Sequence, residues 1–205
     1  MALLVKKFGG TSVGDIKKLQ HIATSICQSK EAGNEIVIVV SAMGKTTDDL
    51  NCLAESISKN PNRRELDMLL STGEQVTIAL LSMVLNEYGV PAISMTGSQV
   101  GIITESIHGK ARILDIKTER IQNYINQGFV VVVAGFQGTT LSHTGSMEIT
   151  TLGRGGSDTS AVALSTALGA ETCEIYTDVP GVLTTDPRIV PNAKLLNEIS
   201  CEEML

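Results

Sequence analysis

The stretch Val5-Lys6-Lys7-Phe8-Gly9-Gly10-Thr11-Ser12-Val13-Gly14 decides how the rest of the chain is read. Apolar and basic residues run into two glycines, and this order predicts a strand that ends abruptly and turns into a helix. Adjacent glycines expose backbone N–H groups because no Cβ blocks them, and Lys7 and the helix N-terminus add positive charge. The stretch therefore suits either a ligand rich in negative oxygen, such as nucleotide phosphates, or a plain turn with an incidental lysine.

Strands and helices alternate along the chain beyond this stretch. Runs of β-branched residues, such as Ile36–Val40 and Val130–Val133, are typical of parallel strands covered on both faces. The pattern predicts strands at 2–8, 36–40, 92–95, 130–133 and 174–177, and helices at 15–31, 46–59, 63–88, 118–126 and 155–168. We expect one α/β domain around a mainly parallel sheet. Short hairpins at 97–116 could belong to a second lobe, and the polar stretch 139–147 is expected to be a mobile loop.

Composition excludes several classes of function. The chain of 205 residues has 3% aromatic content, no tryptophan and a formal charge of −6, which disfavour a nucleic-acid or anionic-membrane surface. Its four cysteines form no C-x-x-C pair, which favours a reduced cytosolic protein. The longest apolar run, 129–136, is much shorter than the ~20 residues of a membrane span, and the N-terminus does not resemble a signal peptide.

Hydroxyl side chains follow the second predicted strand in Ser41-Ala42-Met43-Gly44-Lys45-Thr46-Thr47. A P-loop would require a glycine five positions before Gly44, where Val39 stands, so we reject that interpretation. Ser41 and Thr47 nevertheless lie at the carboxyl end of a strand, where open α/β sheets bind ligands. Capping of the next helix by Thr46 or Thr47 is the alternative, and the two roles are compatible.

Two further stretches carry charge at predicted helix starts. Glu74 opens a long apolar helix, where it would favour the helix N-terminus or hold an ammonium group. Gly153-Arg154-Gly155-Gly156-Ser157-Asp158 places an arginine among three glycines directly before another helix. Arg154 can bind a carboxylate through two parallel hydrogen bonds, whereas Ser157 or Asp158 could simply cap the helix. Glu74, Arg154 and Asp158 together would suit a zwitterionic amino acid.

The last predicted strand ends in Thr177-Asp178-Val179-Pro180-Gly181. Asp178 could orient a lysine or a metal-bound phosphate, and Pro180-Gly181 forms a turn in either case. The three histidines, His21, His108 and His143, share no ligand-like spacing, so we assign no protein metal site.

These motifs occur in an order that resembles the aspartate kinases of the amino-acid kinase superfamily, and the resemblance covers essentially the whole chain. The matching segments are Lys7-Phe8-Gly9-Gly10-Thr11-Ser12, Ser41-Ala42-Met43-Gly44, Ser71-Thr72-Gly73-Glu74, Gly135-Phe136-Gln137-Gly138, Thr151-Leu152-Gly153-Arg154-Gly155-Gly156-Ser157-Asp158 and Thr177-Asp178-Val179-Pro180-Gly181-Val182. The resemblance implies a three-layer αβα sandwich with a central, mainly parallel sheet. It implies transfer of the γ-phosphoryl group of ATP to the β-carboxylate of L-aspartate, the first step towards lysine, threonine and methionine. A cytoplasmic homo-oligomer is expected.

The resemblance also implies roles for individual residues. Lys7, Gly9, Gly10 and Asp178 would be catalytic and face the transferring phosphoryl group. The aspartate would be held by Ser41, Thr47, Glu74, Arg154, Gly155, Gly156, Ser157 and Asp158, with Arg154 on its α-carboxylate. The nucleotide would lie along Lys7, Phe8, Gly9, Gly10, Thr177, Asp178, Leu183, Thr184, Thr185, Asp186, Pro187 and Arg188. Mg²⁺ would be held mainly by the ATP phosphates.

The C-terminal end departs from the family pattern. The chain stops at Leu205, one turn into a predicted helix, whereas aspartate kinases continue through a further phosphate-side lysine to ACT regulatory domains. We therefore expect residues 1–205 to be one catalytic domain truncated at its C-terminal end. The alternatives are a catalytically incompetent fragment that binds nucleotide or a complete subunit, and a related kinase whose acceptor is glutamate, N-acetylglutamate or a nucleoside monophosphate.

Overall fold

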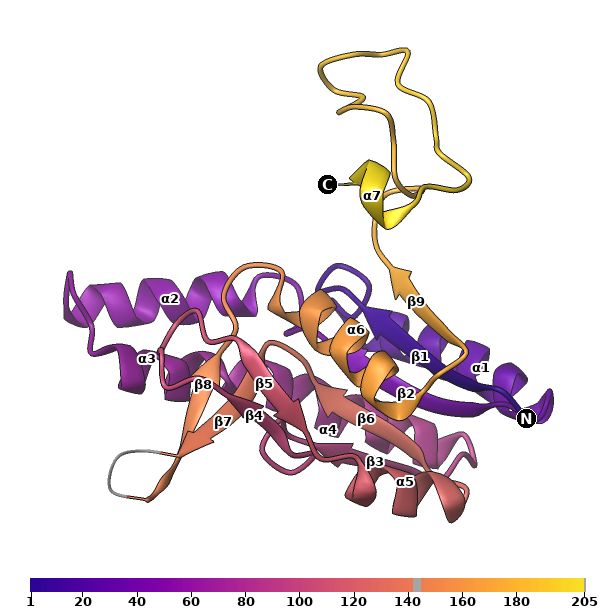
Figure 1. Ribbon diagram of the computed structural model, residues 1–205, viewed down its shortest axis with the longest axis horizontal. Coiled ribbons are helices and arrows are strands. Elements are labelled where there is room, and N and C mark those ends of the chain that lie inside the picture. The colour runs from indigo at the N-terminus through magenta and orange to yellow at the C-terminus, as the bar shows by residue number, and fades with distance from the viewer. Residues whose placement is uncertain (142–144, 205) are drawn as a thin grey trace.

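The structure, a computed structural model, describes residues 1–141 and 145–204. Its centre is a five-stranded parallel sheet in the order β3-β6-β2-β1-β9 (Figure 1). The strands are β1 (Leu3–Phe8), β2 (Glu35–Val40), β3 (Ala92–Met95), β6 (Val130–Ala134) and β9 (Thr172–Tyr176). The predicted parallel sheet is therefore confirmed, and β9 begins two residues earlier than the sequence pattern indicates.

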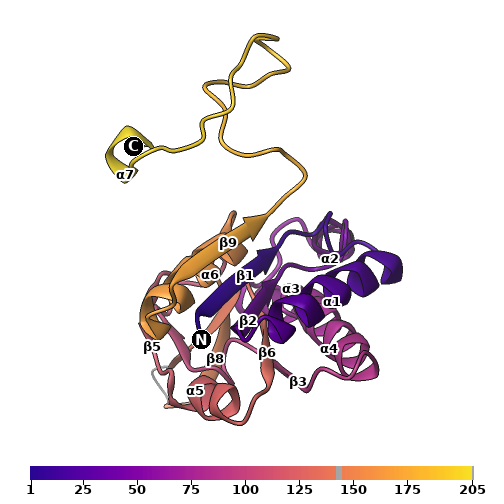
Figure 2. The same ribbon diagram turned by 90° about the vertical axis from the view of Figure 1, so that its right-hand side faces the viewer.

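Helices cover both faces of this sheet. Figure 2 shows α1 (Ile16–Glu31) and α4 (Thr72–Glu87) on one face, with α5 (Glu119–Asn126) and α6 (Gly156–Leu168) on the other. Two further helices, α2 (Thr46–Ile57) and α3 (Arg63–Leu70), pack together beside the sheet, and α7 (Cys201–Met204) is a single turn. The molecule is thus the three-layer αβα sandwich that the resemblance implies.

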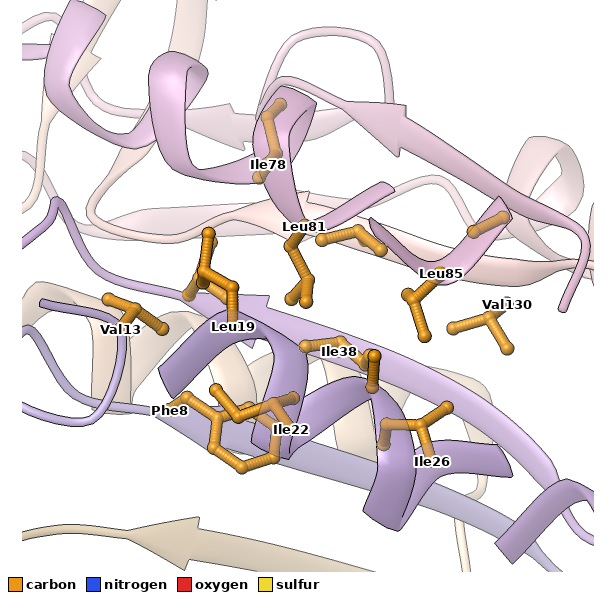
Figure 3. Packing of buried hydrophobic residues seen from close by; sticks show 14 of the residues in the cluster. Phe8, Val13, Leu19, Ile22, Ile26, Ile38, Ile78, Leu81, Leu85 and Val130 are labelled. Atoms are coloured by element: carbon orange, nitrogen blue, oxygen red, sulfur yellow. The ribbon is translucent and has the colours of Figure 1, made fainter. Parts of the chain in front are cut away.

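Alternate residues of each central strand enter two separate cores. In β2, Ile36, Ile38 and Val40 pack towards α1 and α4, whereas Val37 and Val39 pack towards α5 and α6. Figure 3 shows the first core, in which Leu19, Ile22 and Ile26 of α1 meet Ile78, Leu81 and Leu85 of α4. Because both faces are buried, the strands need apolar residues at every position, which explains the continuous β-branched runs.

A second sheet lies beside the central one, in the order β5-β4-β7-β8. It consists of β4 (Ile102–Thr104), β5 (Ile113–Ile116), β7 (Gln137–Leu141) and β8 (Met147–Thr151). The short strands predicted within 97–116 are confirmed as the antiparallel pair β4–β5. The loop predicted at 139–147 is wrong at 139–141 and at Met147, which belong to the antiparallel ladder of β7 and β8. Residues 145 and 146 lie outside both strands, and residues 142–144 lie outside the described part.

The predicted long helix at 63–88 is two helices that meet at Ser71. Together, the stretch Arg63–Glu87 is long and apolar enough to cross a membrane by length and composition alone, and half of its apolar 18-residue window is buried inside the fold. Its apolar residues Ile78, Leu81 and Leu85 belong to the first core. The apolar residues of this stretch are therefore explained by their packing against the sheet.

Candidate active site

A cavity of about 240 Å³ opens at the carboxyl ends of the central strands. Lys7 reaches it from the end of β1, Ser41 directly follows β2, and Phe136 follows β6. The cavity is lined by Lys7, Ser41, Thr47, Glu74, Phe136, Gly153, Arg154, Gly155, Gly156, Ser157 and Asp158. The fold thus brings the whole predicted acceptor-binding set into one hollow, although its members come from segments that are far apart in the sequence.

Glu74 is the most unusual side chain of this cavity. Its side chain is buried, with only 2% of the residue exposed, and Oε1 accepts a hydrogen bond of 3.0 Å from the Ala42 N–H. Its second oxygen, Oε2, is buried and has no hydrogen-bond partner among the described residues. Burial raises the pKa of this carboxyl from 4.5 to about 7, against the smaller opposing effect of the Ala42 N–H. An acidic oxygen without a partner is a ready acceptor for a ligand ammonium group.

Lys7 and Asp158 form an ion pair across the cavity wall. Lys7 Nζ lies 2.6 Å from Asp158 Oδ1, with the lysine side chain 9% exposed and the aspartate side chain 47% exposed. Lys7 points towards α6 because alternate residues of β1 face opposite sides of the sheet. The ion pair holds the ammonium group of a nearly buried lysine at the mouth of the cavity.

Arg154 is presented by two left-handed glycines. Gly153 has φ 78° and Gly155 has φ 74°, and α6 begins directly afterwards. Gly155 is the N-cap and supplies no side-chain cap, so capping by Ser157 or Asp158 is wrong as an explanation of this helix start. Arg154 is exposed at the cavity rim and forms no ion pair with an acidic residue in the described ranges. Its guanidinium group is therefore available for an external carboxylate.

The turn after β1 differs from the expected one. Gly9 donates its N–H to the Tyr176 carbonyl at 3.2 Å and so extends the β1–β9 pairing, which contradicts the expectation that both glycines expose their N–H groups. Gly10 is instead required for space, because a Cβ there would lie 3.0 Å from the Ala42 carbonyl oxygen.

The next helix, α1, starts only at Ile16, and its N-terminus is capped by Asp15, whose Oδ1 accepts from the Lys18 N–H. Its end is therefore not free for an anion.

Capping does not explain the hydroxyl groups after β2. Lys45 is the N-cap of α2 and makes no side-chain cap bond, whereas the Thr46 hydroxyl donates to the Met43 carbonyl at 2.7 Å. Ser41 and Thr47 line the cavity instead. The ligand-binding interpretation of these two hydroxyls remains, and the capping alternative is wrong.

Phe136 is a cavity residue to which the sequence assigned no role. It has φ 68°, the only positive φ of a non-glycine residue in the described part of the chain. The Ser160 hydroxyl accepts its N–H, and Gly156 packs so close that a Cβ there would lie 2.9 Å from the Phe136 ring. Backbone held in a sparsely populated region is typical of functional sites. The signal was an aromatic residue flanked by glycine in Gly135-Phe136-Gln137-Gly138.

Most residues predicted to bind the nucleotide lie either at a second hollow beside α1 or in the segment that follows β9. Phe8 and Thr177 line a second hollow of about 540 Å³ beside α1, where Tyr176 stacks on Phe8 with ring centroids 4.6 Å apart. Asp178 is exposed and accepts from the Thr177 hydroxyl at 3.2 Å. Figures 1 and 2 both show the chain after β9 projecting away from the body. The structure therefore does not bring Leu183, Thr184, Thr185, Asp186, Pro187 and Arg188 to the cavity; their contacts include an Asp186–Arg188 ion pair of 2.7 Å.

The family model described as the amino acid kinase family matches residues 2–205. The chain belongs to the amino acid kinase family. This amino acid kinase is similar to an aspartokinase from Geobacillus stearothermophilus, with 60% identity over 205 residues that cover 100% of this chain and 49% of the relative. Aspartokinase 2 of Bacillus subtilis is 58% identical over the same 205 residues, again 49% of its length. The chain spans about half the length of the curated relatives that it matches.

Solved structures give the same family. The crystal structure of aspartate kinase from Synechocystis matches with a TM-score of 0.85 and 60% identity, covering 99% of this chain and 33% of that one. E. coli aspartokinase III in complex with aspartate and ADP matches with a TM-score of 0.80 and 27% identity, covering 95% of this chain and 53% of that one. A carbamate kinase from Giardia, at 14% identity and a TM-score of 0.73, shares the fold.

The acidic residues around the cavity show which groups could hold a divalent cation. In the described ranges, no three His, Cys, Asp or Glu side chains gather as a metal site. The cavity offers two carboxylates. Glu74 has one oxygen without a partner among the described residues, and Asp158 is already paired with Lys7. That Mg²⁺ would be held mainly by the phosphates of the nucleotide stays a prediction.

Proposed function

We propose that this amino acid kinase is the catalytic domain of an aspartate kinase, formed by residues 1–205. It would transfer the γ-phosphoryl group of ATP to the β-carboxylate of L-aspartate and give 4-phospho-L-aspartate. One observation carries the proposal: a buried, unpartnered carboxylate oxygen of Glu74 and the unpaired guanidinium of Arg154 share one small cavity with Lys7. The similarity to aspartokinases at up to 60% identity supports it.

The two charged groups match the two charges of a free amino acid. Arg154 would bind the α-carboxylate through paired hydrogen bonds, and Glu74 would bind the α-ammonium group and gain the partner that its Oε2 lacks. Ser41, Thr47, Ser157 and Asp158 line the remaining wall and would contact the acceptor. An acceptor without an ammonium group would leave the buried Glu74 unpaired, which carries a desolvation cost. N-acetylated substrates are therefore expected to bind poorly.

The reaction needs charge neutralisation more than a base. The side-chain carboxyl of aspartate is already ionised at neutral pH, so its oxygen can attack the γ-phosphorus without losing a proton. The obstacle is repulsion between two anions, and catalysis of phosphoryl transfer is mainly positioning and electrostatic stabilisation. Lys7, held by Asp158 at the cavity mouth, supplies the fixed positive charge. Gly10 allows the closely packed turn beside it.

The nucleotide is proposed to lie at the same edge of the sheet, along Phe8, Gly9, Thr177 and Asp178, with its phosphates towards Lys7. The segment Leu183–Arg188 is proposed to lie along the nucleotide when ATP is bound. Mg²⁺ bridging the phosphates would neutralise part of their charge. A cytoplasmic, homo-oligomeric enzyme is also proposed, and its support is the similarity to aspartokinases.

The test is an ATP-dependent assay in which acyl phosphate is trapped by hydroxylamine, run side by side with L-aspartate, L-glutamate and N-acetyl-L-glutamate. We expect product from L-aspartate at the highest rate. Product mainly from glutamate would change the acceptor. ATP binding without product from any acceptor would instead support the alternative of a nucleotide-binding chain without catalytic competence.

Lys7→Ala is the matching variant. We expect turnover to fall by at least about a hundredfold, because a fixed charge at the transferring group typically contributes that much, while the chain still folds. Lys59→Ala, which removes an exposed lysine just after the C-terminal end of α2, is the control and should keep its rate. Turnover of Lys7→Ala near that of the unmodified chain would remove Lys7 from the mechanism.

A further inference from the structure

Asp67 of α3 is a buried carboxylate that lies outside the cavity and has all its oxygens occupied. It is 1% exposed, and its Oδ1 accepts a hydrogen bond of 2.6 Å from the Thr151 hydroxyl. Its Oδ2 lies 2.7 Å from His108 Nδ1, and the Gly109 N–H donates to both oxygens at 3.1 Å. One carboxylate therefore ties together α3, the end of β8 and the loop between β4 and β5.

The partners of Asp67 lead directly to Arg154. Thr151 is the last residue of β8, and its carbonyl accepts the Ala111 N–H at 2.9 Å. Gly153 packs on the same loop, since a Cβ there would lie 3.3 Å from the Gly109 carbonyl oxygen. Gly153 also accepts the Gly156 N–H at 3.0 Å, which closes the turn that carries Arg154. The position of Arg154 therefore depends on Thr151 and on the β4–β5 loop, both of which are hydrogen-bonded to Asp67.

The backbone of Asp67 leads to the other half of the cavity. Its carbonyl accepts the Ser71 N–H at 3.0 Å, and α4, which carries Glu74, begins at the next residue. Gln137, buried at the start of β7, donates to the Ser71 carbonyl at 3.0 Å and holds this junction to the second sheet. Asp67 therefore stands between the segment that presents Glu74 and the segment that presents Arg154.

We propose that Asp67, through Thr151 and the Gly109 loop, is a positioning residue that sets the spacing between Glu74 and Arg154 and so the affinity for the amino-acid acceptor. The inference rests on the proposed function, because it concerns the groups that would bind the α-ammonium and α-carboxylate. Asp67 is not among the residues that line the cavity or the second hollow beside α1. Its loss should weaken acceptor binding and leave nucleotide binding unchanged.

The sharpest test removes the Thr151 hydroxyl and keeps the side-chain shape. Thr151→Val should weaken binding of L-aspartate, measured by calorimetry on the whole chain, about tenfold, the order expected when one buried hydrogen bond to a carboxylate is lost. Thr151→Ser keeps the hydroxyl and should restore affinity to within about twofold. ATP affinity should be the same in all of these proteins. Asp67→Asn should also weaken binding of L-aspartate. If the Asp67→Asn protein does not fold, the Thr151 variants alone test the proposal.

Thr150→Val is the matched control. Thr150 is equally buried one residue away in β8, and its hydroxyl pairs with Thr104 at 2.6 Å rather than with Asp67. Both valine variants remove one buried hydroxyl from the same strand, so a merely structural effect would appear in both. Equal aspartate affinities of Thr150→Val and Thr151→Val would overturn the inference.

Amide hydrogen exchange at Gly156 in the ligand-free chain gives a readout independent of the acceptor, because the Gly156 N–H donates to the Gly153 carbonyl and closes the turn that carries Arg154. Thr151→Val should accelerate exchange there, and Thr150→Val should not. If the unmodified chain fails to bind aspartate, the proposed function fails, and the exchange comparison still decides whether Asp67 positions Arg154. Equal exchange in the two valine variants would contradict that role.

Discussion

Two buried carboxylates, Asp67 and Glu74, lie seven positions apart, and the fold treats them in opposite ways. Asp67 receives hydrogen bonds from Thr151 and Gly109 and contacts His108, so each of its oxygens is satisfied. Glu74 receives one backbone N–H, and its Oε2 has no partner among the described residues. A satisfied buried acid stabilises a structure, whereas an unsatisfied one costs free energy and is kept for a ligand or a reaction. At this scale, Glu74 is the acid with an oxygen left for a ligand, and Asp67 is the acid that holds neighbouring segments in place.

The raised pKa of Glu74 predicts a specific pH dependence of stability. The carboxyl has a pKa of about 7 when folded against an ordinary value of 4.5, so the folded state binds the proton more tightly. Stability from this group is therefore fully present below pH 4.5 and is lost as pH rises through about 7, by up to roughly 3 kcal/mol. Glu74→Gln should remove this loss.

Urea denaturation at pH 5 and pH 8 measures the effect. The unmodified chain should lose more stability between these values than Glu74→Gln does, and Glu55→Gln, which changes an exposed glutamate on α2, should behave like the unmodified chain. Parallel changes in the unmodified chain and Glu74→Gln would show that Glu74 does not titrate in this range.

The two helices nearest the proposed reaction start differently. The N-terminus of α1 is closed by Asp15, whose carboxylate accepts the Lys18 N–H at 2.9 Å. The N-terminus of α6 has Gly155 as its cap, makes no side-chain cap bond and opens on the cavity. A helix N-terminus carries partial positive charge, which a capping carboxylate neutralises. At the scale of elements, α6 is therefore the helix whose dipole can act on a bound anion.

Removal of the α1 cap should cost stability without disturbing the cavity. Asp15→Ala should lower the free energy of unfolding by about 1 kcal/mol, because the Lys18 N–H loses its side-chain acceptor. Asp15→Asn keeps an acceptor oxygen and should lose much less. Chemical denaturation of the three proteins measures the difference. Equal losses for the two substitutions would mean that the charge of Asp15 matters rather than its capping bond.

The whole molecule consists of a two-sided core and a projecting C-terminal segment. β9 is the edge strand of the central sheet, and its side chains are pinned to β1 by the Lys6–Glu174 ion pair of 2.9 Å and by the stacking of Phe8 on Tyr176. After Tyr176 the chain leaves the body, as Figures 1 and 2 show. Ile189 and Val190 are exposed there, so the segment contributes little to the apolar core.

Limited digestion with trypsin should follow this division. The first cuts are expected after Arg188 and Lys194, at least about tenfold faster than cuts within residues 1–176, because exposed extended backbone fits a protease without unfolding. Mass spectrometry of early fragments measures the order of cleavage. ATP should slow these cuts if Leu183–Arg188 lies along the nucleotide, and L-aspartate alone should not. First cuts inside the core would contradict the division.

The sequence alone predicted the layered α/β architecture and most of the residues that line the cavity. Continuous β-branched runs such as Ile36–Val40 occur because parallel strands are buried on both faces, and that requirement is visible locally. Glycines around Arg154 likewise signal a turn with positive φ wherever it lies in space. The strands β7 and β8 gave no such signal, because buried threonines such as Thr139, Thr150 and Thr151 look polar until their hydroxyl partners are known.

Only the tertiary structure decided which charged side chains are paired within the protein and which keep an unpaired atom for a ligand. The sequence points to Glu74, Arg154 and Asp158 as candidates and gives no sign of Asp67. It cannot show that Asp158 is paired with Lys7, that the Oε2 of Glu74 lacks a partner among the described residues, or that Thr151 satisfies Asp67. It also suggested an open N–H at Gly9, which β9 occupies from far along the chain. Local pattern sets the backbone of each element, whereas the free energy of a buried polar group depends on neighbours that only the folded chain brings within hydrogen-bond distance.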